Sequence, residues 1–264
     1  MLQAPCGAVH AAEKLSLEEA AARFAETERW IGSIVRRMAV RVRAPKPWRV
    51  LDVGAAQGRG LIALRRLGHQ PFGVEPDREA IEVAHQLAAR EGTTIDLREG
   101  LAEAIPFDDA SFDLVIATSV MEHVGDLEAA LREIHRVLVP GGMFWFNSES
   151  SLCPRQNEIS GFPAFGWYPD PLKRRIMRWA RDHRPALVGY TKHPAFHWWT
   201  PGKARRKLTE AGFGEIVDRW DLRLPEEDSG WRGRVIALLR RHRPLRLLGD
   251  IAVEGCAFAA RRMA

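Results

Sequence analysis

The alternation of short apolar runs with helical stretches between Trp48 and Ser148 constrains the fold of this chain more than any other feature. Strands are expected at residues 48–53, 71–74, 94–98, 112–118 and 143–147, with helices at 58–67, 78–91 and 127–138. Strands that alternate with helices form a mostly parallel α/β sheet with helices on both faces. Right-handed crossovers then place the loops that follow the strands at one edge, where ligands bind.

The sharpest local signal is the segment VLDVGAAQGRG, from Val50 to Gly60, in which an apolar strand leads through small residues into a helix. Gly54 and Gly58 allow a ligand to approach the backbone closely, and the N-terminus of the helix supplies partial positive charge. Nicotinamide and flavin sites use the same device, and a tight turn without any ligand also fits the segment.

Glu75 ends the second expected strand and lies 21 residues after Gly54. An acidic side chain at this place can accept hydrogen bonds from two ribose hydroxyls. The alternative is a carboxylate that only stabilises the N-terminus of the helix beginning after Asp77. Taken together with the glycine turn, Glu75 predicts a nucleoside ligand.

The motifs, taken in order, resemble those of the class I S-adenosylmethionine-dependent methyltransferases, in the type 11 group that includes ubiquinone and menaquinone biosynthesis C-methyltransferases. The resemblance rests on VLDVGAAQG, FGVEPD, EGLAEAIPFDDASFDLVIATSVMEHV and EIHRVLVPGGMFWF, with a weaker echo in WWTPGKARRKLTEAGF. It covers roughly residues 48–148. It implies a Rossmann-like, doubly wound sheet of seven strands, the last antiparallel, and S-adenosylmethionine as cofactor.

The resemblance also implies which residues contact the cofactor. The turn at Asp52, Gly54 and Gly58 would cradle its amino-acid end, Glu75 would hold the ribose, and Pro76 would pack beside the adenine. The complete set of expected cofactor contacts is Asp52, Gly54, Ala56, Gly58, Glu75, Pro76, Leu101, Ala102, Thr118 and Ser119.

Two of these positions depart from the pattern of the family. Leu101 precedes Ala102 where relatives often have an Asp that binds the adenine amino group, and leucine has no atom that can accept that hydrogen bond. Ala56 replaces a frequent glycine. Thr118 and Ser119 match the positions that line the methionine part and the methyl group.

The sulfonium methyl group is already activated, so the enzyme has to align a nucleophile and exclude water. A general base helps when that nucleophile is an alcohol. His123, just beyond the fourth strand, and Glu149, just past the fifth, are the candidate bases. His123 also has a structural alternative, because the family uses this Glu-His-Val segment with many substrates. No metal is implied, and no second half-site for a nicotinamide is found.

Four segments are expected along the chain. Residues 1–47 form an N-terminal helical arm, 48–148 the cofactor-binding core, 149–199 a lid that contacts the substrate, and 200–264 the rest of the core sheet with a basic insertion at 223–250. In the arm, Ser16 and Glu19 predict a capping box, followed by one long helix or by two helices joined near Gly32. A further helix is expected at 202–211, with strands near 215–222 and 252–261.

The charge is divided unevenly. Residues 1–150 sum to −5, from 17 Lys/Arg and 22 Asp/Glu, whereas residues 151–264 sum to +10, from 22 and 12. The segments PLKRRIMRWARDHR (171–184) and GWRGRVIALLRRHRPLRLL (230–248) combine basic residues with an apolar helical face. Such helices bind anionic membrane surfaces, or they pack on a core as ordinary solvated helices. If they bind a membrane, reversing the charges of Arg240 and Arg241 should abolish that binding.

These observations predict an S-adenosylmethionine-dependent methyltransferase that acts on a small molecule or lipid-linked metabolite, with oxygen as the favoured acceptor. The basic segments favour an anionic substrate or an anionic lipid surface. The alternatives are a regulatory protein that binds the cofactor without chemistry, and a nucleic-acid or protein methyltransferase. Nucleic acid is disfavoured because no RNA-binding module is recognisable. Three scattered cysteines and the absence of a signal-peptide pattern favour the cytoplasm, with a peripheral contact at the inner membrane surface.

Overall fold

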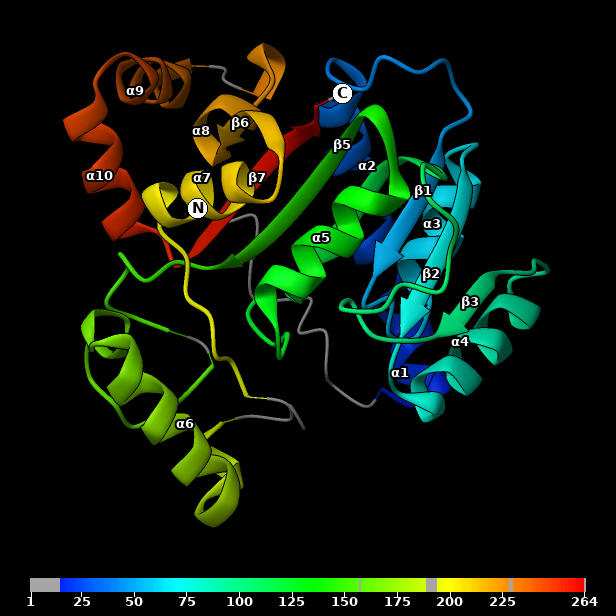
Figure 1. The fold of residues 1–264 in the computed structure, drawn as a ribbon, viewed down its shortest axis with the longest axis horizontal. Coiled ribbons are helices and arrows are strands. Elements are labelled where there is room, and N and C mark those ends of the chain that lie inside the picture. The colour runs from blue at the N-terminus through cyan, green and yellow to red at the C-terminus, as the bar shows by residue number, and fades with distance from the viewer. Residues whose placement is uncertain (1–14, 157, 189–193, 228–229, 264) are drawn as a thin grey trace.

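The computed structural model describes residues 15–156, 158–188, 194–227 and 230–263, which contain one seven-stranded sheet. Its strands are β1 (Arg49–Val53), β2 (Gln70–Glu75), β3 (Asp96–Glu99), β4 (Phe112–Thr118), β5 (Leu138–Glu149), β6 (Phe213–Asp218) and β7 (Gly255–Arg262). Their order is β3-β2-β1-β4-β5-β7-β6 (Figure 1). β7 runs antiparallel to β5 and β6, and the other neighbours are parallel, so the predicted Rossmann-like fold is confirmed.

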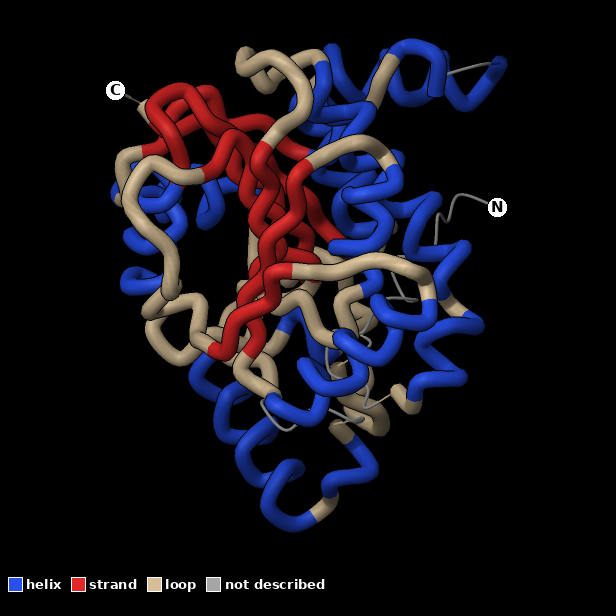
Figure 2. The backbone as a smooth tube through the Cα atoms, turned by 90° about the vertical axis from the view of Figure 1, so that its right-hand side faces the viewer, coloured by secondary structure: helices blue, strands red, loops and turns tan. Residues whose placement is uncertain are grey.

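Helices cover both faces of this sheet, as Figure 2 shows. One layer contains α1 (Leu17–Ala22), α2 (Phe24–Ala39), α3 (Arg59–Arg66) and α4 (Arg78–Arg90). In this layer Ile34 and Met38 of α2 are fully buried against Val50 and Trp145 of the sheet. The segment expected as an N-terminal arm is therefore part of the layer that buries this face of the sheet.

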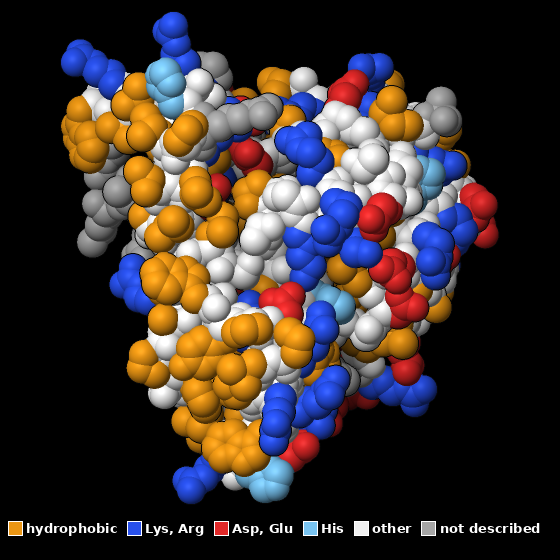
Figure 3. All heavy atoms as spheres, turned by 60° about the vertical axis from the view of Figure 1, so that its left-hand side comes forward, with side chains coloured by type: hydrophobic (Ala, Val, Ile, Leu, Met, Phe, Trp, Pro, Cys, Tyr) orange, Lys and Arg blue, Asp and Glu red, His pale blue; other side chains and the backbone are white. Residues whose placement is uncertain are grey.

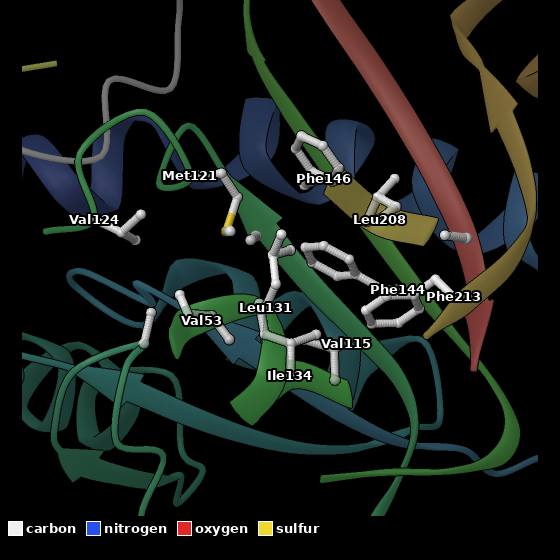
Figure 4. Packing of buried hydrophobic residues seen from close by; sticks show 14 of the residues in the cluster. Val53, Val115, Met121, Val124, Leu131, Ile134, Phe144, Phe146, Leu208 and Phe213 are labelled. Atoms are coloured by element: carbon white, nitrogen blue, oxygen red, sulfur yellow. The ribbon is translucent and has the colours of Figure 1, made fainter. Parts of the chain in front are cut away.

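The opposite face is covered by α5 (Leu127–Val137) and α7 (Pro201–Glu210). Figure 4 shows Leu131 and Ile134 of α5 directed toward Val115 of β4 and Phe144 of β5, and all four side chains are at most 1% exposed. Burial of a leucine or isoleucine of this kind contributes about 1.5–3 kcal/mol. This packing fixes the positions of β4 and β5, whose carboxyl ends carry several of the expected site residues.

The N-terminal helices are joined at Arg23 rather than near Gly32. The Ser16 capping box is present, with the Ser16 backbone N–H donating to Glu19 Oε2 at 2.9 Å. Gly32 lies buried within α2, between Ile31 and Ile34. A glycine inside a helix costs about 1 kcal/mol relative to alanine, which is less than the burial of these neighbours provides.

The strand expected near 215–222 is shorter than predicted. β6 ends at Asp218, whose Oδ1 accepts hydrogen bonds from the backbone N–H groups of Trp220 at 3.0 Å and Asp221 at 3.4 Å. This cap starts the short helix α8 (Arg219–Leu222), which is followed by α9 (Gly230–Arg241) and α10 (Arg243–Ala252). Because α10 continues to Ala252, the last strand begins at Gly255.

The segment between β5 and α7 is the one expected as a lid, and it is called the lid below. It contains α6 (Asp170–His183) and has a small core of its own, in which Phe165, Met177 and Trp198 are buried. The lid is joined to the sheet edge by a parallel bridge between Ser150 and Trp199. None of the helices in the described ranges is long and apolar enough to cross a membrane.

Candidate functional site at the carboxyl edge of the sheet

The turn after β1 needs glycine at position 54. Gly54 has a φ of 71°, and a Cβ there would lie only 2.4 Å from Cγ2 of Val120, which follows β4. The Gly54 backbone N–H donates to the carbonyl of Val74 in β2 at 2.8 Å. The turn is therefore held close to both neighbouring strands, and any side chain at this position would displace it.

The alanine that replaces a frequent glycine adopts the conformation for which glycine is favoured. Ala56 has a φ of 47°, a left-handed conformation that costs a non-glycine residue about 1 kcal/mol or more. Its backbone N–H donates to Glu75 Oε2 at 2.8 Å. This bond holds the strained turn, so the shape of the loop is kept without the glycine.

Glu75 connects the first two turns of the site. It is 6% exposed, and besides Ala56 its carboxylate accepts from the backbone N–H of Asp77, at Oε1 and 3.0 Å. Burial raises the pKa of Glu75, and the two backbone hydrogen bonds oppose that rise. Each carboxylate oxygen has two lone pairs, so both oxygens still have capacity for hydroxyl donors. The carboxylate therefore fits a ribose.

Asp52 lies beneath the first turn of α3. It is 6% exposed, and a Cβ at Gly60 would lie 2.5 Å from its Oδ2, so the backbone of α3 passes directly over the carboxylate. Burial, and to a smaller extent the negative charge of Glu75, raise the pKa of Asp52 from 3.8 to about 7. Near neutral pH this carboxyl group is therefore poised to ionise when a cation approaches.

The raised pKa of Asp52 predicts a pH-dependent stability. The folded protein holds a proton on Asp52 up to about pH 7 that the unfolded chain releases near pH 3.8. The stabilisation that results from this proton is fully present below pH 3.8 and is lost as the pH rises through about 7. Between about pH 5 and pH 8 the unfolding free energy of the protein without cofactor should fall by roughly 3 kcal/mol more than that of Asp52→Asn. Urea denaturation of both proteins measures this, and parallel pH profiles would contradict it.

The turns after β2 and β3 contain the residues expected beside the adenine. Pro76 is exposed at the end of β2, and the Gly100 backbone N–H donates to the Glu75 carbonyl at 3.1 Å. Leu101 is 55% exposed, whereas Ala102 is buried in the core beneath it. Leu101 therefore offers an apolar surface at this edge, without the acceptor that an Asp would provide.

A hydrogen bond connects the ends of β4 and β5. The Ser119 backbone N–H lies 3.2 Å from Asn147 Oδ1, and Ser119 itself has a φ of 52°. The Thr118 hydroxyl is buried and has no hydrogen-bond partner within the described part of the chain. A buried hydroxyl without a partner costs about 1–3 kcal/mol unless a ligand or water satisfies it. This orphaned group supports a polar ligand at the end of β4.

Three glutamates converge beyond Thr118. Glu149 ends β5, Glu122 follows β4, and Glu158 belongs to the lid; Glu122 and Glu149 both raise the pKa of Glu158 through their charge. Burial raises the pKa of Glu122 to about 8, opposed by Ser148 and reinforced by Glu149. The pKa of Glu158 is raised well above its ordinary value, mainly by burial.

Neither Glu122 nor Glu158 was identified from the sequence. Of the two expected bases, Glu149 belongs to this group, and His123 directly follows Glu122. Glu122 immediately precedes His123, in a Glu-His-Val segment that the family uses with many substrates and that therefore gives no signal for a base. No spacing in the sequence relates Glu158 to the other two glutamates, because only the path of the lid brings it close to them. Glu122 Oε2 and Glu158 Oε1 are buried without a hydrogen-bond partner among the residues that the structure describes. The Glu158 Oε2 atom accepts from Trp198 Nε1 at 3.1 Å.

Comparisons with known proteins identify the family of this chain. A family model described as a methyltransferase domain matches residues 51–146. The ubiquinone/menaquinone biosynthesis C-methyltransferase of Methylobacterium nodulans is 31% identical over 196 residues, covering 69% of this chain and 71% of that protein. A ubiquinone biosynthesis O-methyltransferase of Methylocella silvestris is 38% identical over 107 residues, covering 39% of this chain and 41% of its own length. The match spans about two fifths of the first curated relatives.

A solved structure shows the same fold along almost the whole chain. The PH0226 protein of Pyrococcus horikoshii superposes with a TM-score of 0.60 at 18% identity, covering 95% of this chain and 94% of that one. The chain belongs to the class I S-adenosylmethionine-dependent methyltransferases. Its cofactor is S-adenosylmethionine. The contacts of Gly54 and Glu75 with the nucleoside part of this molecule stay a prediction.

Proposed function

We propose that this methyltransferase transfers the methyl group to an oxygen of a small molecule or lipid-linked metabolite. The observation that carries the proposal is a group of three glutamates with buried carboxyl oxygens at the ends of β4 and β5 and in the lid, Glu122, Glu149 and Glu158. A hydroxyl acceptor needs a group that takes its proton, and a buried carboxylate with a raised pKa is a suitable base. Transfer to a neutral amine makes a smaller demand of this kind, because its lone pair can attack before any proton is lost.

The cofactor supplies an electrophilic methyl group, and the protein supplies its alignment. We assign Glu75 to the ribose, the turn at Asp52, Gly54, Ala56 and Gly58 to the amino-acid end, and Thr118 and Ser119 to the methionine part. Pro76, Leu101 and Ala102 would surround the adenine. The support is that the turns after β1, β2 and β3 are joined by backbone hydrogen bonds and by Glu75.

The acceptor would lie between this cofactor site and the lid. Glu122 is linked to the lid through its carbonyl, which accepts from the backbone N–H of Phe196 at 2.8 Å. His123 and Glu149 remain candidate proton acceptors, and Glu122 joins them because its pKa of about 8 makes it a stronger base than an ordinary carboxylate. Three buried carboxyl groups disfavour an anion at the reacting end, so any anionic part of the acceptor would lie further out.

The test is to supply S-adenosylmethionine with an isotopically labelled methyl group and a panel of phenols, alcohols and amines, each free and attached to an isoprenoid chain. The expected product carries the label on oxygen, with one S-adenosylhomocysteine formed per methyl group transferred. Labelled methyl on carbon or nitrogen only would overturn the choice of acceptor atom. Calorimetry on the same preparation measures cofactor binding. A protein that binds the cofactor but forms no product has been given an unsuitable acceptor, whereas a protein that binds no cofactor is inactive.

A further inference from the structure

The pair of helices α9 and α10 turns apolar side chains toward solvent. Trp231, Val235 and Leu238 are spaced along one face of α9, and Trp231 is 65% exposed. Leu247 and Leu248 of α10 are likewise exposed, Leu248 to 62%. Single exposed leucines are ordinary, but five large apolar side chains on one helix pair indicate a surface that contacts something apolar.

Two arginines of the same pair, Arg240 and Arg246, point inward instead. Arg240 donates to the backbone carbonyls of Trp220 at 2.7 Å and Arg223 at 2.6 Å. Arg246 donates to both carboxylate oxygens of Asp221 at 2.9 Å. These bonds attach the pair to α8, and they fix the orientation in which the leucines face outward. At Arg240 and Arg246 the arrangement is the reverse of that in an ordinary surface helix, in which arginine faces water and leucine packs inward.

The lid helix α6 presents a second surface of the same character. Leu172 and Trp179 are more than two fifths exposed. Trp179 stacks on His183 with ring centroids 6.3 Å apart, and both line a surface hollow of about 390 Å³ together with Arg184. Figure 3 shows hydrophobic side chains gathered on this side of the molecule, with Lys and Arg beside them.

The charge around these surfaces identifies the partner. Residues 230–246 contain six arginines and no acidic residue, and Arg234 and Arg241 of α9 are exposed. Residues 170–184 contain six Lys/Arg and two Asp. Exposed tryptophan and leucine flanked by arginine match the boundary between lipid headgroups and acyl chains, where apolar groups insert and cations meet anionic lipid. Nucleic acid would use the arginines but leave the leucines without a role.

Both surfaces are attached to the edge of the sheet that holds the active site. The lid follows β5 directly, and α10 leads into β7, where the Ser150 backbone N–H donates to the Glu254 carbonyl at 2.9 Å. In Figure 1 both α6 and the α9–α10 pair lie on the left, away from α3 and α4. A membrane on this side would face the lid.

We infer that α6 and the α9–α10 pair together form a docking face for an anionic membrane surface. The face places the lid, and the acceptor site beneath it, next to the lipid from which a lipid-linked acceptor would enter. This last point rests on the proposed function, whereas the docking itself does not. Anionic headgroups would meet the arginines, and the neutral hydroxyl end of the acceptor would reach the glutamates.

The inference is tested by sedimenting the full chain with vesicles of phosphatidylglycerol and phosphatidylcholine, and with phosphatidylcholine alone. The wild-type chain should bind the anionic vesicles and not the neutral ones. The pair Arg234→Glu and Arg241→Glu, and separately the pair Leu247→Ser and Leu248→Ser, should each weaken binding at least about tenfold. Arg240 is left unchanged, because its backbone contacts would make the loss of binding ambiguous.

The matched control is the pair Arg29→Glu and Arg65→Glu, which makes the same change of charge on exposed residues of α2 and α3. It should bind the anionic vesicles like the wild type. Equal loss in this control, or full binding by the leucine variant, would overturn the docking face, as would absence of wild-type binding. Competition by RNA that is unaffected by the leucine variant would indicate nucleic acid instead. Cofactor affinity, measured on each variant, shows that the fold and the methyltransferase site are intact.

Discussion

Glu75→Ala is expected to weaken the binding of S-adenosylmethionine roughly a hundredfold or more. The substitution removes the proposed acceptor of the two ribose hydroxyls, and each hydrogen bond to a charged group contributes about 1.5–3 kcal/mol. It also leaves the backbone N–H of Ala56, now bonded to Glu75 Oε2 at 2.8 Å, without its partner. The strained turn at Ala56 would then relax, so the amino-acid end of the cofactor loses its cradle as well.

Two further variants separate these contributions in calorimetric titrations with S-adenosylmethionine and S-adenosylhomocysteine. Glu75→Gln keeps one carbonyl oxygen and should lose less affinity than Glu75→Ala. Glu82→Gln, an exposed position on α4, should bind like the wild type. If Glu75→Ala retained wild-type affinity while its melting temperature fell, Glu75 would serve the turn alone and the ribose assignment would be wrong.

The part of the site that could be predicted from the sequence is the part built from consecutive residues. A strand, a turn and a helix that follow one another place Gly54 and Glu75 at adjacent strand ends whatever the rest of the chain does, because the topology of such sheets allows little else. The antiparallel last strand was predicted by the family resemblance instead. Propensity failed at Gly32, where burial of α2 outweighed the preference of glycine for helix ends.

The acceptor side could not be predicted in this way. Glu158 reaches Glu122 and Glu149 only because the lid folds back over the sheet edge, and no periodicity in residues 149–199 encodes that path. The inward orientation of Arg240 was equally invisible, because a basic amphipathic pattern does not say which face packs on the core. Its partners are backbone carbonyls of α8 and the loop after it, which any sequence could supply. Reversing Arg240, as the pattern alone would suggest, would therefore disturb the fold.

The rate of methyl transfer to a hydroxyl acceptor is expected to rise with pH around a midpoint of about 8. Glu122 must be ionised to take the proton, and burial raises its pKa to about 8. Glu122→Gln should abolish this rise and lower kcat/KM by about a hundredfold or more above the midpoint, which is the range of general base catalysis. Initial rates across the pH range, with the acceptor found in the labelling experiment, measure both effects.

The Glu149→Gln variant tests the same assignment through the midpoint of the pH profile. The charge of Glu149 contributes to the raised pKa of Glu122, so its removal should move the midpoint to lower pH while the rise itself is kept. Glu82→Gln, far from the acceptor site, should leave the profile unchanged. If the rate still rose around the same midpoint in Glu122→Gln and in Glu149→Gln, the titration would belong to the acceptor's own hydroxyl or to His123. A Glu149→Gln variant that is flat across the pH range would make Glu149 the base, with Glu122 as the group that tunes it.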